Sequence, residues 1–345
     1  MRSRKAFSII EVIFVLVVLG IVASITSQII AQVYENYIQQ RAVYNISTRT
    51  ELVVNQIVNR LSYRIQGSTI SKDHETFLAG GFTASRGVNW LPLKDVPTTG
   101  ETYTSIEWIG YDNDSLAAYT KQPGWSGVAN YESASKNRFD TPGSYLVHAR
   151  DIISHLSIDE NDMTHVDLQN RPAAVLFDEK DNYYDGNREY DPICMGLIPE
   201  DAKSNTDCIF PVLMDDNNTL RFTRASDPNS AAIRDKIITE RYKLAWSAYA
   251  VAPEPRQDAQ GNIVIGTDGR TLYDLVLYSN YQPWNGDTYL SGTRHVLMSN
   301  VSVFKFSETG GVIRFKICAQ EDIGQRESDG TPINVSICKE KAVIR

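Results

Sequence analysis

The chain lacks most of what a catalytic or metal site requires. Its five histidines show no metal-ligand spacing, and His74-Glu75 is not followed by the second histidine of a zinc-protease helix. The segment Gly124-Trp125-Ser126-Gly127 lacks the spacing of a nucleophile elbow. With no catalytic constellation to argue from, the sequence predicts a protein that is not an enzyme.

Clusters of positive charge are also missing beyond the first few residues. The chain has 42 acidic and 34 basic residues, which gives a formal net charge of -8. Phosphate binding needs a clustered cationic surface, so we expect no nucleic-acid partner. The 345 residues have an ordinary globular composition, with 42% hydrophobic and 22% charged residues and no internal repeat, and they suffice for a sizeable core.

Cysteine is scarce, and its spacing excludes a zinc knuckle or a C-x-x-C redox motif. The four cysteines form two sequence-local pairs, Cys194 with Cys208 and Cys318 with Cys338. If they are bonded in this way, each disulfide stabilises the fold by roughly 3 kcal/mol in the chain-entropy model. Four cysteines allow other connectivities, and four free thiols are a further alternative. An oxidising compartment favours disulfides.

The N-terminus predicts such a compartment. Arg2, Arg4 and Lys5 precede Phe7, and an apolar run extends from Val12 to about Ile30. Counted from Phe7, the segment is long enough to cross a hydrocarbon core of about 30 Å. The basic flank predicts that the chain after this span faces away from the cytoplasm. We therefore expect a membrane span at residues 7–30.

Three interpretations of this segment compete. A cleaved signal peptide would use Val22-Ala23-Ser24, but its apolar core would be shorter than the one present. A plain signal anchor explains everything except Glu11, the only ionisable group within the span. An intramembrane carboxylate costs about 2.5 to 3.5 kcal/mol and by default indicates a functional partner.

The third interpretation supplies that partner. Residues Lys5 to Ile25 resemble the class III signal of type IV prepilins and pseudopilins: a basic leader, a small residue, then Phe-Ser-Ile-Ile-Glu and an apolar helix. The resemblance implies that a prepilin peptidase removes residues 1–6 by cutting between Ala6 and Phe7, and that the new Phe7 amine is methylated. It also implies that Glu11 pairs with the amine of a neighbouring subunit. Ala6 replaces the family's usual glycine, and Gln28 replaces the helix-kinking proline of many major pilins.

The helix should continue beyond the membrane over residues 31–65. Apolar residues recur mostly at three- and four-residue spacing, and polar residues take the other face. The apolar set is Val43, Tyr44, Ile46, Val54, Ile57, Val58, Leu61 and Ile65, and the polar set is Glu51, Asn55, Asn59 and Arg60. One helix from Phe7 to about Ile65 would be roughly 90 Å long.

Short alternating segments then predict strands, at Arg241–Val251, Thr271–Tyr278, Val301–Phe306 and Val312–Cys318. Gly310-Gly311 and Asp268-Gly269 read as turns, and Pro253 to Gly261 as a polar turn region. Residues 67–235 give little periodic signal and predict loops and short strands without a second domain boundary. The fold class is therefore α+β: a long N-terminal transmembrane helix that continues into a pilin-like head, residues 66–345, with a mainly antiparallel sheet.

The last strands narrow the resemblance. Val296 to Phe306, followed by Arg314 to Cys318, are similar to the late strands of pseudopilin J and minor pilin W. This resemblance and the large head imply a minor subunit that initiates or caps a filament of a type II secretion system or type IV pilus. The alternative is a filament-tip binding module, an adhesin or a substrate-recognition subunit, on the same anchor.

The same resemblance implies the partners and the cellular location of the protein. Expected partners are other pilins or pseudopilins, the prepilin peptidase, and the inner membrane with its assembly platform. The expected location is the inner membrane, crossed once, with the C-terminal domain in the periplasm or in an extracellular pilus.

Two loop features remain open. The acidic residues Asp178, Asp181 and Asp185 are weak calcium candidates without EF-hand spacing, and a solvated acidic loop is the alternative. No other cofactor is expected. The aromatic residues Tyr183, Tyr184, Tyr281 and Trp284 could form a ligand platform or belong to the core.

Overall fold

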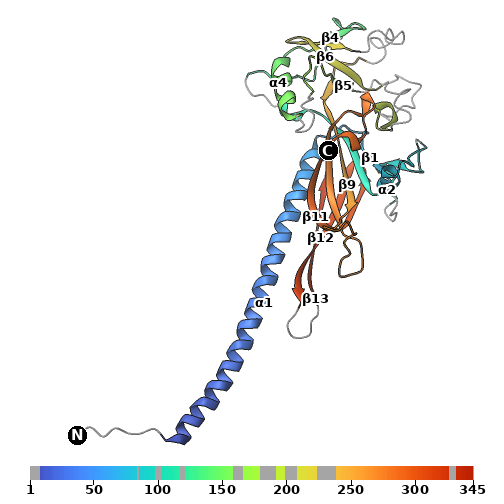
Figure 1. The fold of residues 1–345 in the computed structure, drawn as a ribbon. Coiled ribbons are helices and arrows are strands. Elements are labelled where there is room, and N and C mark those ends of the chain that lie inside the picture. Colours follow the sequence, from blue (N-terminus) through green and yellow to red (C-terminus); the bar gives the residue numbers. More distant parts are fainter. Residues whose placement is uncertain are drawn as a thin grey trace.

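The computed structural model consists of one long helix that leads into a head with two antiparallel sheets (Figure 1). It describes residues 8–83, 85–97, 103–116, 121–157, 166–178, 192–198, 208–223, 238–325 and 332–344. This arrangement confirms the predicted α+β class.

Helix α1 (Ile9–Ser62) runs for 54 residues without a break, which corresponds to about 80 Å. It passes Gln28 uninterrupted, as the absence of proline predicts. At its C-terminal end the Arg64 guanidinium donates to the Leu61 carbonyl (3.0 Å) and to the Gly311 carbonyl (2.8 Å). A cation at this end satisfies free helix carbonyls, and here it also ties the helix to the sheet.

The part of α1 nearest the head buries one stripe. Its buried members are Ala42, Ile46, Thr50, Val53, Val54, Ile57 and Leu61. Thr50 fits this apolar stripe because its hydroxyl donates to the Ile46 carbonyl at 2.7 Å. The prediction was wrong for Val43 and Tyr44, which are exposed, because the helical period turns both away from the stripe through Ala42 and Ile46.

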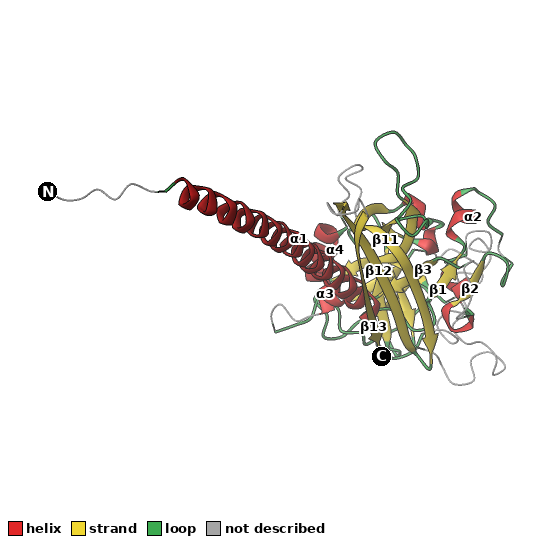
Figure 2. Cartoon of the chain, turned by 90° about the horizontal axis from the view of Figure 1, so that it is seen from below, coloured by secondary structure: helices red, strands yellow, loops and turns green. Residues whose placement is uncertain are grey.

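The main sheet receives this stripe. Its eight strands pair antiparallel in the order β13-β12-β11-β10-β9-β3-β1-β2, and α1 lies across one face (Figure 2). The core between them contains Trp108, Leu275 and Ile317 together with the helix stripe. The strand bounds are β1 (Ile70–Lys72), β2 (Trp90–Pro92), β3 (Ser105–Gly110), β9 (Ser247–Pro255), β10 (Tyr273–Tyr281), β11 (Thr293–Thr309), β12 (Val312–Gln325) and β13 (Pro332–Val343).

Short elements cover the opposite face of the main sheet. They are α2 (His74–Leu78), η2 (Pro192–Met195), η4 (Pro283–Asn285) and η5 (Tyr289–Ser291), whereas η1 (Leu93–Asp95) adds Leu93 to the core on the α1 face. Phe77, Met195, Trp284 and Tyr289 from α2, η2, η4 and η5 share one apolar core. Tyr281 and Trp284 are each 1% exposed, so these two belong to the core and form no ligand platform. Tyr183 and Tyr184 lie outside the described residues.

The late strands largely follow the prediction, and the Gly310-Gly311 turn joins β11 to β12. Two predictions were wrong. Arg241–Val251 is not one strand, because the chain changes sheets at Trp246 between β8 (Tyr242–Ala245) and β9. Strand β9 also extends through Pro253 to Pro255, where β3 no longer pairs with it, so a proline there removes no ladder hydrogen bond.

The strands of the second sheet come between β3 and β9 in the sequence, and their order in the sheet is β4-β7-β6-β5-β8. Together with helices α3 (Asn113–Leu116) and α4 (Leu146–Leu156) this sheet forms a part of the head that we call the upper lobe. Its remaining strands are β4 (Arg138–Asp140), β5 (Ala173–Phe177), β6 (Phe210–Asp216) and β7 (Thr219–Phe222). The described part of residues 67–235 consists mainly of loops and short strands, as predicted, but the sequence did not indicate that strands β4 to β8 form a sheet with a core of its own.

Strand β5 shows why the sequence hid this lobe. Val175 and Phe177 face the lobe's own core, whereas Ala174 and Leu176 face the core shared with the main sheet. All five residues of β5 are buried, so the strand has no alternation of apolar and polar residues.

The upper lobe depends on the aromatic cluster around Phe139, which packs against Phe177, Phe222 and Tyr242 at ring-centroid distances of 5.3 to 5.5 Å. We predict that Phe139→Ala lowers the free energy of unfolding by about 3 to 5 kcal/mol through a cavity. Urea denaturation of the detergent-solubilised chain, followed by tryptophan fluorescence, measures this. The control Val128→Ala, at a position 45% exposed in the same lobe, should change it by less than about 0.5 kcal/mol. Equal effects would contradict the assigned core.

A buried carboxyl group marks the entry to the upper lobe. The Asp112 amide donates to the Leu244 carbonyl (2.7 Å), its carbonyl accepts from Trp125 Nε1 (2.8 Å), and its carboxyl group accepts from the Ser115 amide (3.2 Å). Burial raises the pKa of Asp112 from 3.8 to about 7. Between pH 3.8 and about pH 7, the Asp112 carboxyl group therefore keeps its proton in the folded state but has lost it in the unfolded state.

We predict that this group makes the stability fall as the pH rises from about 4 to about 7, and that its contribution levels off above pH 7. Asp112→Asn should remove this slope, which amounts to about 4 kcal/mol at most. Urea midpoints of both proteins between about pH 5 and pH 8 test it. Parallel pH profiles for the two proteins would show that Asp112 does not titrate in this window.

Candidate assembly site

The first part of α1 has no cover from its own chain. Every residue from Ser8 to Ile30 is exposed, and the large apolar side chains Phe14, Leu16 and Leu19 are 62% to 69% exposed. Among the described residues, α1 is the one helix long and apolar enough to cross a membrane. Such a surface is stable only against lipid or against other apolar helices.

Glu11 lies in the first turn of this helix. Its Oε2 accepts a hydrogen bond from the Ser8 amide at 3.1 Å. This contact satisfies an amide that has no partner within the helix, and it places a negative charge at the positive end of the helix dipole. Ala6 and Phe7, the predicted processing residues, lie outside the described residues.

An apolar surface continues along α1 past the predicted membrane span. Tyr34, Tyr37 and Tyr44 are 64%, 58% and 71% exposed. Their spacings of three and seven residues place them on one side of the helix, away from the stripe that packs on the sheet. The helix therefore offers one surface to its own head and another to surroundings outside the chain.

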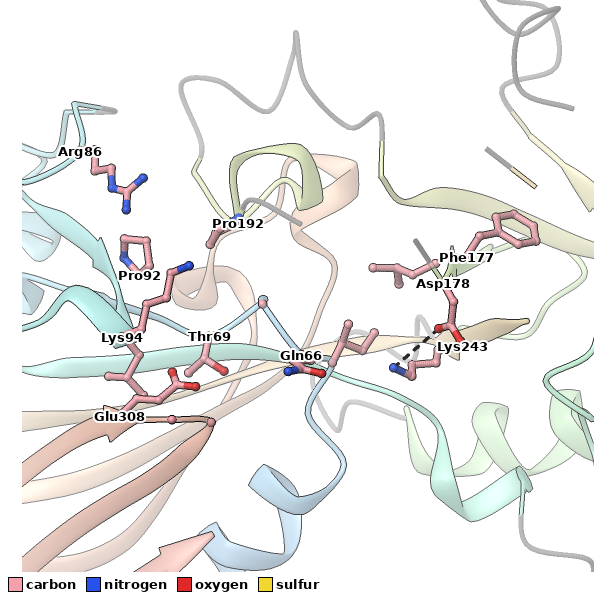
Figure 3. Close-up of a pocket in the computed structure, with 16 residues that line it drawn as sticks. Gln66, Thr69, Arg86, Pro92, Lys94, Phe177, Asp178, Pro192, Lys243 and Glu308 are labelled. Atoms are coloured by element: carbon pink, nitrogen blue, oxygen red, sulfur yellow. Dashed lines mark ion pairs between the residues drawn. The ribbon is translucent and has the colours of Figure 1, made fainter. Parts of the chain in front are cut away.

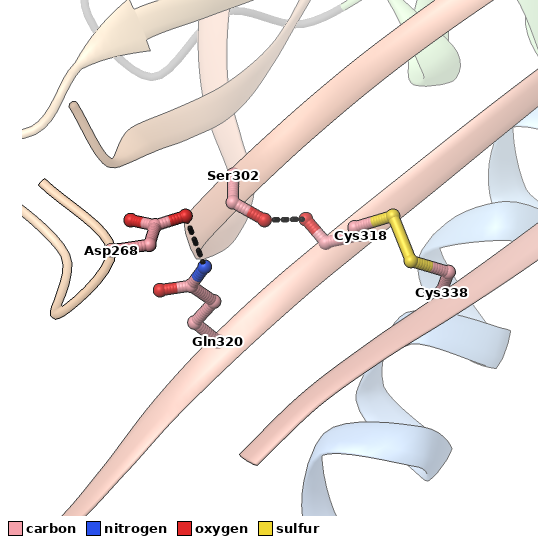
Figure 4. Close-up of a disulfide and its surroundings, with 5 residues drawn as sticks. All are labelled: Asp268, Ser302, Cys318, Gln320 and Cys338. Atoms are coloured by element: carbon pink, nitrogen blue, oxygen red, sulfur yellow. Dashed lines mark hydrogen bonds between the residues drawn. A yellow bond between two sulfur atoms is a disulfide. The ribbon is translucent and has the colours of Figure 1, made fainter. Parts of the chain in front are cut away.

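Both sequence-local cysteine pairs are disulfides in the structure, as predicted. Cys318 in β12 and Cys338 in β13 are directly opposite in the strand register, with their Cα atoms 4.0 Å apart (Figure 4). Cys194 in η2 is bonded to Cys208, with a Cα separation of 5.3 Å. The first disulfide closes the hairpin β12–β13 beside α1, and the second holds two segments against the core on the other face.

The same hairpin carries charge to the helix. Lys341 and Lys339 of β13 lie 3.1 Å and 3.7 Å from the Glu51 carboxylate of α1. A hydrogen bond from Lys341 lowers the pKa of Glu51, with smaller electrostatic contributions from both lysines. Glu51 is therefore on the polar side of the helix, as predicted, and it faces the edge strand.

The calcium prediction remains a prediction. Asp178 is described, and its carboxylate lies 4.0 Å from the Lys243 ammonium group. Asp181 and Asp185 lie outside the described residues. Within the part of the chain that the structure describes, no group of three or more His, Cys, Asp or Glu side chains could hold a metal ion.

A cleft of about 870 Å³ lies just beyond the C-terminal end of α1, between the main sheet and the upper lobe (Figure 3). Lys94, Lys243, Asp178 and Glu308 give its lining both signs of charge. Burial raises the pKa of Glu308, while the neighbouring cations Arg64 and Lys94 act in the opposite direction. The lining combines charged and apolar groups, which suits binding.

Sequence reasoning missed one buried ion pair. Lys72 of β1 and Glu107 of β3 lie 2.6 Å apart, and both side chains are 1% exposed. The available signal was Glu107 itself, a single charge within the apolar run Ile106 to Ile109. The same argument, applied to Glu11, had predicted a functional carboxylate.

These features define a class of protein: a membrane-anchored α+β chain whose single N-terminal helix exposes an apolar surface and carries a folded head. The family model described as the prokaryotic N-terminal methylation motif matches residues 1–27. The N-terminal segment therefore carries a methylation motif, which supports its resemblance to the signal of type IV prepilins and pseudopilins. Neither the curated proteins nor the solved structures that were compared contain a match.

Proposed function

We propose that the protein is a minor pilin or pseudopilin that initiates or caps a periplasmic filament of a type II secretion system or type IV pilus. The observation that carries this proposal is the uncovered apolar surface from Ser8 to Ile30, on a helix that begins with a methylation motif. In a membrane this surface contacts lipid, and in a filament it packs against the helices of neighbouring subunits. One surface thus serves both states.

The proposal divides the chain into a leader (residues 1–6), a transmembrane segment (7–30), a periplasmic extension of the helix (31–65) and the head (66–345). Prepilin peptidase cuts between Ala6 and Phe7, and the Phe7 amine is methylated. The basic residues of the leader hold the N-terminus in the cytoplasm, so the head lies in the periplasm. The assembly platform of the inner membrane and other pilin-like subunits are the partners.

Glu11 selects and positions the neighbouring subunit in this proposal. Its Oε2 already accepts the Ser8 amide, and a carboxylate has further acceptor positions for the Phe7 amine of a neighbour. Each of the two charges alone would be costly in the apolar layer, and pairing them offsets both costs. Entry into the filament thereby becomes favourable.

The upper lobe supports a capping or initiating role. It lies at the end of α1 opposite the N-terminus, beyond the sheet that packs on the helix (Figure 1). A subunit inside a densely repeated filament must fit between copies above and below it. A bulky lobe at this end is accommodated most easily where nothing is stacked above it. A bulky lobe at this end therefore also agrees with the resemblance to pseudopilin J or minor pilin W.

The cleft favours a second candidate function, a filament-tip binding module. It lies just beyond the end of α1, between the two sheets, and its lining carries both signs of charge (Figure 3). An adhesin or substrate-recognition subunit would expose this cleft at the tip. Both functions use the same anchor and differ only in what contacts the head.

We predict that Glu11→Ala leaves membrane insertion intact and lowers incorporation into sheared filaments at least about tenfold, because about 1.4 kcal/mol of lost pairing already produces that factor. Membrane fractionation and quantitative immunoblotting of the filament fraction measure the two effects. Glu35→Ala is the matched control, since Glu35 is a helix carboxylate beyond the membrane span. Normal incorporation of the Glu11 variant would contradict the pairing.

A further inference from the structure

The buried ion pair of Lys72 and Glu107 lies on the face of the main sheet opposite α1. In the register of β1 and β3, Ile70 is opposite Glu107, so Lys72 and Glu107 are diagonal neighbours on the same face. Lys72 Nζ is 2.6 Å from Glu107 Oε2, and both side chains are 1% exposed. Despite this distance, Oε2 has no hydrogen-bond partner among the described residues, so the approach of Nζ lacks hydrogen-bond angles.

Aromatic rings enclose the ammonium group. Lys72 Nζ lies 4.9 Å from the ring centre of Phe77 and 5.5 Å from those of Phe82 and Tyr289. The rings interact favourably with a cation, but they also exclude water from the lysine nitrogen. Two unit charges removed from water are expensive unless their geometry is very good. A neutral product made from the same two groups would relieve that cost.

The other carboxylate oxygen is held separately. Tyr281 donates its hydroxyl hydrogen to Glu107 Oε1 at 2.9 Å. Burial and the nearby Glu107 carboxylate raise the pKa of Tyr281 far above its usual range, so the phenol remains a donor. The two oxygens of Glu107 therefore differ: one accepts from a fixed donor, and the other lies against an amine.

We infer that Lys72 and Glu107 are a modification site, at which the two side chains condense to an intramolecular amide bond that links β1 to β3. This inference is independent of the proposed filament role. One proton of the ammonium group passes to Oε2, and the Nζ lone pair then forms a bond to Cδ. The C–Oε2 bond breaks, and Oε2 leaves as water with two of the three original ammonium protons. The third stays on the amide nitrogen, so charge and atoms balance without an oxidant.

The contacts around Lys72 and Glu107 each favour this condensation. The fixed approach of Nζ replaces a bimolecular encounter, for which effective molarities reach about 10⁵ to 10⁸ M. Tyr281 stabilises the negative charge that develops on Oε1 in the tetrahedral intermediate, and it then donates to the amide carbonyl. The dry surroundings favour the neutral amide and slow the return of water.

The position of the bond gives it a mechanical use. Strand β1 is the first strand after α1, and it has only three residues. A pull on α1 that breaks its packing on the sheet is passed along the chain to this short strand first. A covalent link from Lys72 to Glu107 would prevent β1 from separating from β3 under such a load.

Mass spectrometry of the full-length wild-type chain, purified in detergent and denatured, tests the proposal directly. We expect an intact mass that is lower, by one water molecule, than the observed N-terminus and the two disulfides require. A tryptic digest should contain one branched peptide in which Lys72 is joined to Glu107, and trypsin should not cut after Lys72. A full mass with cleavage after Lys72 would overturn the proposal, as would water loss located at other residues.

Variants separate chemistry from folding. Glu107→Ala should restore cleavage after Lys72, and Lys72→Met, which keeps the side-chain length but removes the amine, should restore the missing water mass. Tyr281→Phe keeps the ring and removes the donor, so bond formation should slow by about 100-fold, as for loss of an oxyanion donor. The ratio of branched to linear peptide over time, in protein with unchanged circular dichroism, measures this. An unchanged rate in Tyr281→Phe would exclude the positioning role of Tyr281.

Discussion

Helix α1 must satisfy two different surroundings along one uninterrupted length. From Ser8 to Ile30 none of its side chains is buried by the chain, whereas from Ala42 to Leu61 a stripe packs on the main sheet. The remainder of the structure follows from this division. The sheet provides a surface for the second half, and the first half needs lipid or other helices. Arg64 links the C-terminal end of α1 to the main sheet, because its guanidinium donates to the Leu61 carbonyl of the helix and to the Gly311 carbonyl in the turn between β11 and β12.

The main sheet is covered on both faces, so the other elements of the head are arranged around it. On one face it packs against α1, and on the other it shares a core with short helical elements and with strand β5 of the upper lobe. Because β5 also belongs to the core of the upper lobe, the upper lobe and the main sheet are joined by apolar packing as well as by the chain. The Cys318–Cys338 disulfide closes the hairpin that lies beside the helix.

The sequence predicted the parts whose signals are local. The apolar span, the helix through Gln28, the two disulfides and the Gly310-Gly311 turn were all visible as patterns of neighbouring residues. The upper lobe was not, because β5 is buried on both faces and β4 has only three residues. The helix stripe was misjudged at Val43 and Tyr44, since apolar character alone does not show which side faces the sheet. Of the site, Glu11 stood out as a charge in an apolar run, while the contact between Lys72 and Glu107 depends on strand register.

The central claim is that this helix is the anchor of a processed pilin-like subunit. The most direct test is the N-terminal mass of the protein isolated from its native membrane, determined by peptide mass spectrometry. The account predicts a mature chain that begins at N-methylated Phe7, with residues 1–6 removed. An intact Met1 would indicate a plain signal anchor, and a chain beginning beyond Ser24 would indicate a conventional secreted protein; either result would contradict the claim.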